Sequence, residues 1–346
     1  MRIAIIGFGV VGQGLVEILR DKGEALRQQN ALDIQVVAVC DTAKGAVYHP
    51  QGLNPALLLQ AVQSTGSLGG YPDGAGLVRG LDSLGTIRDT GADVIVEATW
   101  TNLETGEPAI THIRTAFQAG KHVVTSNKGP VALAYRELKA LADANGLLWG
   151  IEGTVMSGTP ALRLGTTALA GCTIRAIQGI LNGTTNFILT RMEEGASYAE
   201  ALAEAQRLGY AEADPTADVE GYDALGKLLI LAAVVLNHPI TAQQVNRQGI
   251  THLTPQDIQR AKEQGKRWKM IAELQRTEAG VRASVAPQMI EISHPLAGVS
   301  GAANAITYVT DLLGEVTLMG PGAGQRETGF ALLSDILEIH RSAKKK

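Results

Sequence analysis

Cysteine is scarce in this 346-residue chain, which has only Cys40 and Cys172. The two lie far apart in unlike contexts, which argues against a disulfide framework and against a thiolate metal cage. We therefore expect a reducing, cytoplasmic setting. Long apolar runs are also missing. The run after Arg2 is too short for a signal sequence, and no later run reaches about 18 residues. The sequence thus predicts neither export nor membrane insertion.

An excess of positive charge is absent as well, since the net charge is -4 and the sequence pI is about 6.0. Aromatic residues make up only 4% of the chain, and no basic stretch is interleaved with them. There is consequently no basic field for a nucleic acid. We interpret the three lysines at 344–346 as a solvated end. The hydrophobic content of 45% suits globular domains, and the length allows two of them.

The first motif is a glycine-rich turn between an apolar β run at residues 2–6 and a helical pattern. It reads GFGVVG over residues 7–12. In a dinucleotide-binding fold Gly7 permits the tight turn, Gly9 lets the backbone approach a pyrophosphate, and Gly12 lets helix and strand pack closely. The helix N-terminus then faces the anion. The predicted cofactor contacts along this turn are Gly7, Phe8, Gly9, Val10, Val11 and Gly12.

An acidic residue follows the second predicted strand, at residues 34–40. Asp41 stands where a carboxylate would accept a hydrogen bond from the adenosine ribose 2′-hydroxyl of NAD. Its spacing from the glycine turn is longer than the usual ~20 residues, because the polar stretch at 21–33 extends the first helix and its loop. Lys44, three residues further on, can instead accept the 2′-phosphate of NADP. The choice between NAD and NADP is therefore left open.

Predicted strands and helices alternate in the next stretch, with strands at 92–99 and 122–125 and helices at 106–119 and 131–144. This alternation predicts an α/β fold with a Rossmann-type, doubly wound parallel sheet, whose ligand crevice lies at the carboxyl ends of the strands. Thr99 and Lys128 lie at such ends. We place the nucleotide-binding domain at 1–145.

The pattern changes beyond residue 146. It predicts strands at 172–181 and 281–286 and helices at 184–192, 197–208 and 219–236. Such a mixture indicates a second, mixed α+β catalytic and dimerisation domain with its own sheet, which we place at 146–318. A second glycine turn, at 320–324, precedes a predicted helix over 328–339. This turn is another candidate anion or cofactor contact, and we expect residues 319–346 to complete the first domain.

The segment EADPTADVEGYDALGK at 212–227 concentrates carboxylates around one lysine, just before a long apolar stretch. Asp223 and Lys227 are four residues apart, hence on one helical face, and Asp218 sits where a helix cap would. Glu212 precedes them in a proline-stiffened loop. A lysine at the edge of low-dielectric surroundings is a tunable proton donor, and a carboxylate suits the ammonium group of an amino acid. Acids at a helix N-terminus beside an ordinary ion pair would give the same pattern, so both interpretations stay open here.

Four segments occur in an order that resembles the homoserine dehydrogenases, and the likeness runs over nearly the whole chain. They are TSNKG at 125–129, NGTTNFIL at 182–189, LGYAEADPTADVEGYDALGK at 208–227 and GPGAG at 320–324. The third is long enough to be highly specific. The length is similar to that of the short form of the family, without a regulatory or kinase domain. The resemblance implies interconversion of L-homoserine and L-aspartate 4-semialdehyde with NADP or NAD, in threonine, methionine and isoleucine biosynthesis.

The resemblance also implies roles for individual residues. Lys227 matches the proton donor and acceptor, with Asp218 and Asp223 ordering it and the substrate. Glu212 matches the residue that holds the ammonium group of the substrate. Lys128 matches a lysine near both the nicotinamide and the substrate. Thr184 matches a hydroxyl near the substrate. Thr99 and Gly324 match residues that contact the cofactor.

Two further implications of the resemblance concern an ion and a partner chain. The family places a monovalent cation, usually sodium, on backbone carbonyls of one segment. This chain departs from the family with Met156, where small residues are common, and with SNK at 126–128, where ANK is frequent. A bulky side chain need not disturb carbonyl ligands. The carbonyls that would bind the cation in this chain are those of Glu152, Val155, Ser157 and Thr159.

The resemblance also implies a homodimer through the sheet of the second domain.

Two other functions fit parts of the sequence. The run from Gly171 to Thr173 faintly resembles the cysteine nucleophile of phosphorylating aldehyde dehydrogenases, but Cys172 stands at the start of a predicted strand rather than at a helix N-terminus, where a thiolate is stabilised. A catalytically silent NAD(P)-binding regulatory protein would need the cofactor site but not Lys227 at its spacing from Asp223. Another amino-acid dehydrogenase would use the same groups on a different substrate.

Overall fold

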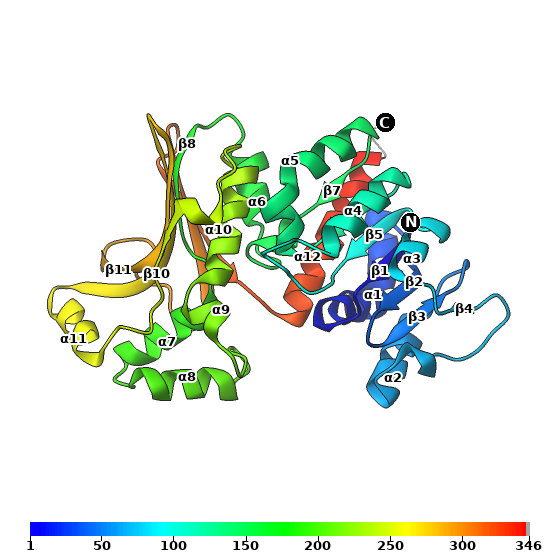
Figure 1. Ribbon diagram of the computed structural model, residues 1–346, viewed down its shortest axis with the longest axis horizontal. Helices are drawn as coiled ribbons and strands as arrows, with labels where there is room; N and C mark the ends of the chain where they lie inside the picture. Colours follow the sequence, from blue (N-terminus) through cyan, green and yellow to red (C-terminus); the bar gives the residue numbers. More distant parts are fainter. Residues whose placement is uncertain (344–346) are drawn as a thin grey trace. The chain divides into compact units, whose positions relative to one another are not determined.

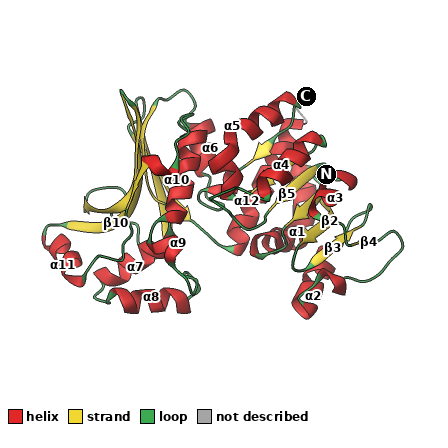
Figure 2. Cartoon of the chain, viewed as in Figure 1, coloured by secondary structure: helices red, strands yellow, loops and turns green. Residues whose placement is uncertain are grey.

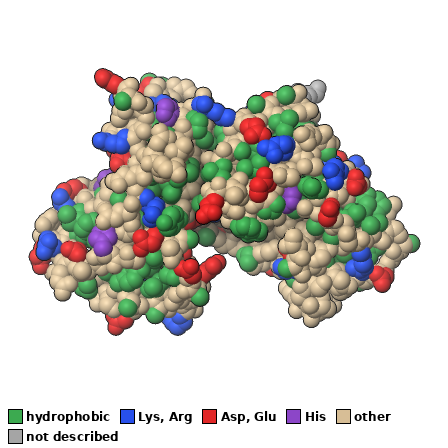
Figure 3. Space-filling view, in the orientation of Figure 1, with side chains coloured by type: hydrophobic (Ala, Val, Ile, Leu, Met, Phe, Trp, Pro, Cys, Tyr) green, Lys and Arg blue, Asp and Glu red, His purple; other side chains and the backbone are tan. Residues whose placement is uncertain are grey.

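The computed structural model describes residues 1–343, and the lysine tail at 344–346 lies outside the described residues. The chain forms two compact units (Figure 1). The first comprises Met1–Gly158 and the stretch from Gly324 onward, and the second comprises Thr159–Ala323. None of the described helices is long and apolar enough to span a bilayer. Acidic and basic side chains are interspersed on the visible face of each unit, in keeping with the small net charge (Figure 3).

A seven-stranded sheet forms the centre of the first unit, in the order β4-β3-β2-β1-β5-β6-β7. Its parallel strands are β1 (Arg2–Ile6), β2 (Gln35–Asp41), β5 (Val94–Glu97), β6 (His122–Thr125) and β7 (Trp149–Gly150). The chain leaves β1 for β2 on one side and later returns to β5 on the other side, so the switch point of a doubly wound sheet lies at β1. The predicted Rossmann-type sheet is confirmed.

One edge of this sheet differs from a purely parallel arrangement. β3 (Gly45–Tyr48) pairs antiparallel with β2, and β4 (Val78–Arg79) pairs antiparallel with β3. Only residues 42–44 separate β2 from β3. Parallel pairing needs a crossover of a dozen or more residues, so a connection this short can only form a hairpin.

Helices cover both faces of the sheet because successive residues of a strand point to opposite sides. Ile3 and Ile5 of β1 lie in one apolar core, and Ala4 and Ile6 lie in the other. The first core is closed by α1 (Val10–Asn30), α2 (Pro55–Thr65), the 3₁₀ turn η1 (Leu68–Gly70) and α12 (Gln325–Ala343), and the second by α3 (Ser83–Asp89), α4 (Ala109–Gln118) and α5 (Lys128–Ala144). The end of the chain therefore returns to the first unit, as predicted (Figure 1).

The predicted domain boundary at residue 145 lies earlier than the one in the structure. β7 pairs with β6, so it belongs to the first sheet. The 3₁₀ turn that follows, η2 (Glu152–Thr154), is tied to α12 by a hydrogen bond of 3.0 Å from the N–H of Glu152 to Asp335 Oδ2. The first unit consequently extends to Gly158. Local sequence does not distinguish the last strand of one sheet from the first strand of the next.

The second unit contains a six-stranded sheet in the order β13-β12-β8-β10-β11-β9. The strands are β8 (Ile174–Ile180), β9 (Val245–Arg247), β10 (Lys266–Thr277), β11 (Gly280–Glu291), β12 (Ala303–Thr310) and β13 (Glu315–Pro321). All pairs are antiparallel except β11 with β9. The sequence predicted only β8 and β11. The central strand β10 escaped prediction because Lys269 and Glu273 interrupt its apolar residues.

The two faces of this second sheet differ in chemistry. Cross-strand neighbours form an apolar row on one face, which contains Val316, Tyr308, Ile177 and Leu274, and a polar row on the other, which contains Thr317, Thr307, Gln178 and Glu273. Helices pack on the apolar face (Figure 2), where the hydroxyl of Tyr308 donates to the carbonyl of Ala161 at 2.7 Å. The helical segments of the unit are α6 (Ala161–Arg163), the π turn η3 (Leu164–Ala168), α7 (Gly183–Glu193), α8 (Tyr198–Arg207), α9 (Thr216–Val219), α10 (Tyr222–Val234), η4 (Ala242–Gln244) and α11 (Pro255–Glu263).

The helix predicted at 219–236 begins three residues later, as α10, and residue 219 instead ends a separate short helix, α9. α9 ends at Val219 and α10 begins at Tyr222, and Gly221 lies between them with a φ of 80°. A left-handed residue breaks a helix, and glycine adopts that conformation without strain. Asp218 therefore lies inside α9, and the prediction that it caps a helix is wrong. The N-cap of α10 is Gly221.

The turn after β1 has the geometry that its three glycines predict. Gly7 has a φ of 94°, and a Cβ there would meet the carbonyl oxygen of Ala98 at 2.5 Å. A Cβ on Gly12 would lie 2.4 Å from the carbonyl oxygen of Gly7. Gly9, in contrast, faces open space, and as the N-cap of α1 it has no side chain to occupy the helix N-terminus. The turn therefore leaves room for an anion at the start of α1.

This geometry predicts that the same change, glycine to alanine, destabilises the protein at position 12 but not at position 9. Gly12→Ala should lower the free energy of unfolding by about 1–3 kcal/mol, because the new Cβ would overlap a backbone oxygen. Gly9→Ala should change it by less than about 0.5 kcal/mol, because the methyl group enters open space. Urea denaturation of both variants without cofactor measures the difference. Equal stabilities would contradict the described packing of the turn.

Candidate functional site

Lys227 lies on α10, a helix that is buried almost all round. Its side chain is 9% exposed, and its Nζ donates to the carbonyl oxygen of Leu181 at 2.5 Å and to Asp223 Oδ2 at 2.6 Å. An ammonium group offers three N–H donors. The third has no partner among the described residues. A buried ammonium group with one donor to spare can bind an oxygen atom of a ligand and protonate it.

The side-chain amide of Asn182 connects the two carboxylates of the cluster. Its Nδ2 donates to Asp218 Oδ1 at 2.6 Å and to Asp223 Oδ2 at 3.0 Å. Its Oδ1 accepts the N–H of Thr185 at 2.8 Å and so caps α7. Sequence reasoning missed Asn182, although the NGTT run at 182–185 has an N-cap residue directly before a helix. The junction of β8 and α7 is therefore the support on which this cluster is built.

Burial raises the pKa of Asp218 above its ordinary value, and the neighbouring charge of Asp223 adds to the rise. Hydrogen bonds from Asn182 and Thr184 and the charge of Lys227 act in the opposite direction. Two carboxylates that share a poorly solvated site repel each other, which disfavours ionisation. Asp218 therefore favours its protonated form more than an exposed aspartate does.

The other predicted substrate contacts of the second unit are Thr184, near the start of α7, and Glu212, in a loop. Thr184 is buried, and its hydroxyl donates to the carbonyl oxygen of Tyr210 at 2.6 Å. Glu212 follows in the loop between α8 and α9, where its backbone carbonyl accepts from Gln206 at 3.1 Å. Its side chain is exposed. The structure thus places Thr184 beside the Asp218 cluster, whereas Glu212 presents itself to solvent.

In the first unit, the carboxylate of Asp41 holds the end of β2 and the glycine turn together. Oδ2 accepts the N–H of Phe8 at 2.7 Å, and Oδ1 accepts the N–H groups of Ala43 and Lys44 at 2.9 and 3.0 Å. Although burial opposes its ionisation, these three hydrogen bonds hold the pKa of Asp41 below its ordinary value. Lys44 Nζ lies 3.9 Å from Oδ1. With an acid and a base side by side, the geometry is compatible with either NAD or NADP.

Thr99 and Lys128 follow the carboxyl ends of β5 and β6, which are neighbours in the sheet. Asn127 links the two segments, because its Nδ2 donates to the carbonyl oxygens of Trp100 at 3.0 Å and of Thr99 at 3.2 Å. Its Oδ1 accepts the N–H of Gly129 at 3.0 Å and caps α5, of which Lys128 is the first residue. Both predicted contacts therefore lie at the carboxyl ends of the parallel strands, where the glycine turn after β1 also lies.

Gly324, the last predicted cofactor contact, directly precedes α12. Its φ is 138°, and a Cβ there would lie 2.0 Å from Glu327 Oε2. The start of α12 packs closely on α1, since a Cβ on Gly14 would meet the carbonyl oxygen of Gln325 at 2.1 Å. The structure therefore brings Gly324 near α1 within the first unit. The helix begins earlier than the predicted residue 328.

The segment predicted to bind a cation forms a compact turn. Ser157 has a φ of 53°, unusual for a residue with a side chain, and its hydroxyl lies 2.8 Å from Thr328 Oγ1. Met156 is fully buried, so its bulk is packed inside the protein. Thr159 is the first residue of the second unit, and its carbonyl accepts the N–H of Ala161 at 2.7 Å. Among residues 1–343, no group of three or more His, Cys, Asp or Glu side chains is placed to hold a metal.

Cys172 lacks the surroundings of a catalytic thiol. It lies between η3 and β8, and its N–H donates to the carbonyl oxygen of Leu169 at 3.0 Å. A helix N-terminus or a neighbouring cation stabilises a reactive thiolate, and Cys172 follows the end of a helical segment instead. The acylating alternative therefore gains no support from the geometry.

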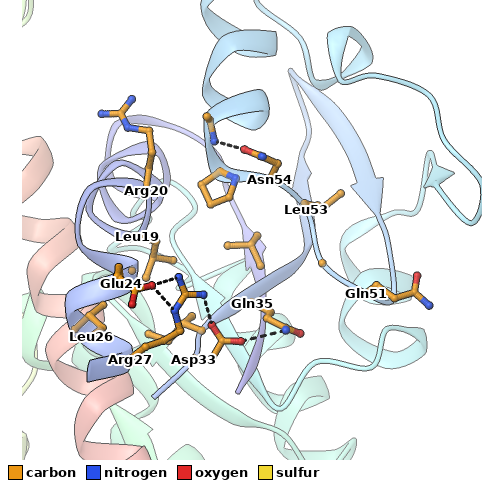
Figure 4. Close-up of a pocket in the computed structure, with 16 residues that line it drawn as sticks. Leu19, Arg20, Glu24, Leu26, Arg27, Asp33, Gln35, Gln51, Leu53 and Asn54 are labelled. Atoms are coloured by element: carbon orange, nitrogen blue, oxygen red, sulfur yellow. Dashed lines mark hydrogen bonds and ion pairs between the residues drawn. The ribbon is translucent and has the colours of Figure 1, made fainter. Parts of the chain in front are cut away.

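A cavity of about 530 Å³ opens between α1, the start of β2 and the N-terminus of α2 (Figure 4). The charged side chains in its wall are paired, since Arg27 donates to Glu24 at 2.7 Å and to Asp33 at 3.3 Å. The N-terminus of α2 is capped by the side chain of Asn54. The cavity lies at the amino end of β2, whereas Asp41 lies at the carboxyl end. It is therefore separate from the predicted dinucleotide site.

Two family profiles match the chain, each over most of one unit. The profile described as "Homoserine dehydrogenase, NAD binding domain" matches residues 7–152. The profile described as "Homoserine dehydrogenase" matches residues 160–337. The first match includes the glycine turn, and the second includes the Lys227 cluster.

Individual proteins agree with the profiles. The NAD(+)-dependent homoserine dehydrogenase of Pseudomonas canavaninivorans is 46% identical over 348 residues, which cover 100% of this chain and 97% of that protein. The homoserine dehydrogenase of Methanocaldococcus jannaschii is 41% identical over 346 residues, 100% of both chains. A hyperthermophilic archaeal homoserine dehydrogenase, solved in complex with NADPH, superposes with a TM-score of 0.83 at 30% identity, over 99% of this chain and 98% of that one. By sequence over its whole length and by fold, this chain belongs to the homoserine dehydrogenase family.

Proposed function

We propose that this chain catalyses the NAD(P)-dependent interconversion of L-homoserine and L-aspartate 4-semialdehyde. The observation that carries the proposal is the buried ammonium group of Lys227, held by Asp223 and the Leu181 carbonyl with one donor to spare. Membership of the family supplies the identity of the substrate. Relatives that use NAD(+) or bind NADPH support either cofactor. The reaction serves the biosynthesis of threonine, methionine and isoleucine.

The first unit holds the cofactor in this proposal. The turn at 7–12 receives the pyrophosphate, because Gly9 leaves space beside the N-terminus of α1. Asp41 would meet the adenosine ribose, Lys128 would lie near the nicotinamide, and Thr99 and Gly324 would make further contacts with the cofactor. When bound, the nicotinamide supplies or accepts the hydride.

Lys227 handles the proton in both directions of the reaction. When the aldehyde is reduced, negative charge develops on its oxygen, and Nζ donates a proton to that oxygen. The reverse reaction requires the neutral amine as a base. The Asp223 carboxylate, whose Oδ2 lies 2.6 Å from Nζ, holds the amino group in place for the transfer.

The remaining groups of the cluster suit the rest of an amino-acid substrate. Glu212 binds the ammonium group of the substrate in this proposal, and its exposed position makes it available. Thr184 lies at the start of α7, where the helix dipole favours a carboxylate. Asp218 and Asp223 orient both the substrate and Lys227.

Lys227→Ala should lower kcat by about 10²-fold to 10⁴-fold, the contribution typical of a positioned acid or base, and should leave NAD(P)H binding intact. Homoserine-dependent reduction of NAD and of NADP measures turnover, and fluorescence titration measures binding. Lys139→Ala is the matched control. Lys139 also pairs with an aspartate four residues away, Asp143 at 2.5 Å, but its side chain is 44% exposed. It should turn over like the wild type.

Three outcomes of that assay would contradict the proposal in different ways. Near-normal turnover by Lys227→Ala would assign the proton to another group. Loss of cofactor binding in the same variant would give Lys227 a structural role. A wild-type protein that binds NAD(P) without oxidising homoserine would be a catalytically silent binding protein, or a dehydrogenase of another amino acid.

We also propose that the backbone carbonyls of Glu152, Val155 and Ser157 bind a monovalent cation, with Thr159 as a fourth ligand. Carbonyl oxygens suit an ion of low charge, and the left-handed Ser157 fixes the course of the turn. Saturating Na⁺ should therefore raise the melting temperature relative to tetramethylammonium at equal ionic strength. Differential scanning fluorimetry checks this. Identical melting temperatures in the two salts would contradict cation binding.

We further propose that the protein forms a homodimer through the polar row of the second sheet. Helices pack on the opposite face, and Met319, on the same face as the polar row, is 63% exposed. One face of a sheet can serve both partners of a two-fold dimer.

Sedimentation equilibrium should give about twice the chain mass of 36.4 kDa. Met319→Asp should shift the mass toward that of the monomer, because it places a charge within the proposed contact. Val78→Asp, an exposed apolar position of the first unit, is the control. A monomeric wild type, or a Met319→Asp variant that stays dimeric, would contradict this assignment.

A further inference from the structure

Glu97, the last residue of β5, has no exposure to solvent. The sequence pattern assigned it no role, because it ends an otherwise apolar strand. A buried carboxyl group is costly unless hydrogen-bond donors surround it. Its position at the carboxyl end of a central strand places it at the edge of the sheet where a dinucleotide binds.

Every partner of this carboxyl group can donate a hydrogen bond. Oε1 accepts from the hydroxyl of Thr99 and from its N–H, the latter at 3.3 Å. Thr125 Oγ1 lies 3.3 Å from Oε2 and donates at 2.8 Å to the backbone carbonyl oxygen of Glu97. On the other side, His112 Nδ1 lies 3.5 Å from Oε1, while its Nε2 lies 2.9 Å from Ser83 Oγ. These contacts suit a side chain whose oxygens accept hydrogen bonds.

The contacts of Glu97 extend to Lys128. Thr125 Oγ1, beside Glu97, accepts the N–H of Asn127 at 3.0 Å. Asn127 in turn donates to the carbonyl of Thr99 and caps α5, which begins at Lys128. Glu97 therefore holds both of the chain segments that leave β5 and β6.

The cofactor lies across the switch point of a doubly wound sheet, which here is β1. Asp41 ends β2 on one side of β1, so the adenosine half extends that way. The nicotinamide half extends toward β5 and β6, where Glu97 lies. A nicotinamide ring is positively charged when oxidised and neutral when reduced. A buried negative charge near it therefore favours the oxidised form.

We propose that Glu97 is a positioning residue that also biases the site toward oxidised cofactor. Its carboxylate fixes Thr99 and the start of α5 at the nicotinamide half, and its charge acts on the ring. This inference rests on the proposed function and adds to it a residue and a preference between the two redox forms.

Glu97→Gln tests both the positioning role and the effect of the charge. It keeps the size of the side chain and removes the charge. It also replaces one accepting oxygen by an amide group that donates and therefore faces other donors. Dissociation constants for NAD⁺ and NADH, or for the NADP pair if the wild type prefers it, are measured by fluorescence titration and competition on the full chain. Both forms should bind more weakly, and the oxidised form most. The ratio of the oxidised to the reduced constant should rise about threefold to tenfold.

Two further variants separate the charge from the structure. Glu97→Asp keeps the charge but withdraws it from Thr99, so it should weaken both forms alike and leave the ratio unchanged. Ile113→Val is the control for stability, because Ile113 is fully buried in the same core, next to His112 in sequence, and makes no polar side-chain contact. Ile113→Val should keep the wild-type ratio of dissociation constants while it lowers the melting temperature about as much as Glu97→Gln does.

An unchanged ratio in folded Glu97→Gln would overturn the proposal, since it would show that the charge of Glu97 does not act on the ring. Should Glu97→Gln fail to fold, unchanged affinities in Glu97→Asp would overturn the positioning role. The titration needs no homoserine. A wild type that binds cofactor without oxidising homoserine would therefore defeat the proposed function and leave this test intact.

Discussion

Burial of the ammonium group of Lys227 is the constraint on which the second unit depends. A charge inside a protein must be given acceptors, and here the Leu181 carbonyl and the Asp223 carboxylate provide them. Each acceptor has its own support. Leu181 directly follows β8 on the way into α7, and Asp223 also accepts from Asn182, the cap of that helix. One cation thus fixes a strand end, a helix cap and the start of α10 relative to one another.

The first unit solves the opposite problem, because it must leave space for an anionic ligand while remaining packed. Gly12 lets α1 approach β1, and Gly9 leaves the helix N-terminus open. The carboxylate of Asp41, in the position expected to meet a ribose, also accepts the N–H of Phe8 and so builds the turn. Groups proposed to serve the ligand therefore serve the fold as well.

Much of the fold was predictable because it rests on local patterns. The strand, glycine turn and helix at the start of the chain follow from apolar periodicity and glycine positions within about 20 residues. The errors have equally specific causes. A single left-handed residue, Gly221, makes α10 begin later than its apolar residues indicated, and β10 was hidden because its buried Lys269 finds partners in Asn186 and the Val299 carbonyl, far along the chain.

Some residues of the candidate site were likewise predictable from local sequence, and others were found only in the structure. The sequence by itself determined the glycine turn, Asp41 and the pair of Asp223 and Lys227, because a four-residue helical spacing is local. Only the tertiary structure decided that Asn182 joins the two carboxylates and that the Leu181 carbonyl holds Lys227, since those partners are 36 to 46 residues apart. Glu97 likewise meets His112 and Thr125 across 15 and 28 residues. A buried polar side chain has no signature of its own in sequence, because what justifies its burial is a donor or acceptor that only folding brings within reach.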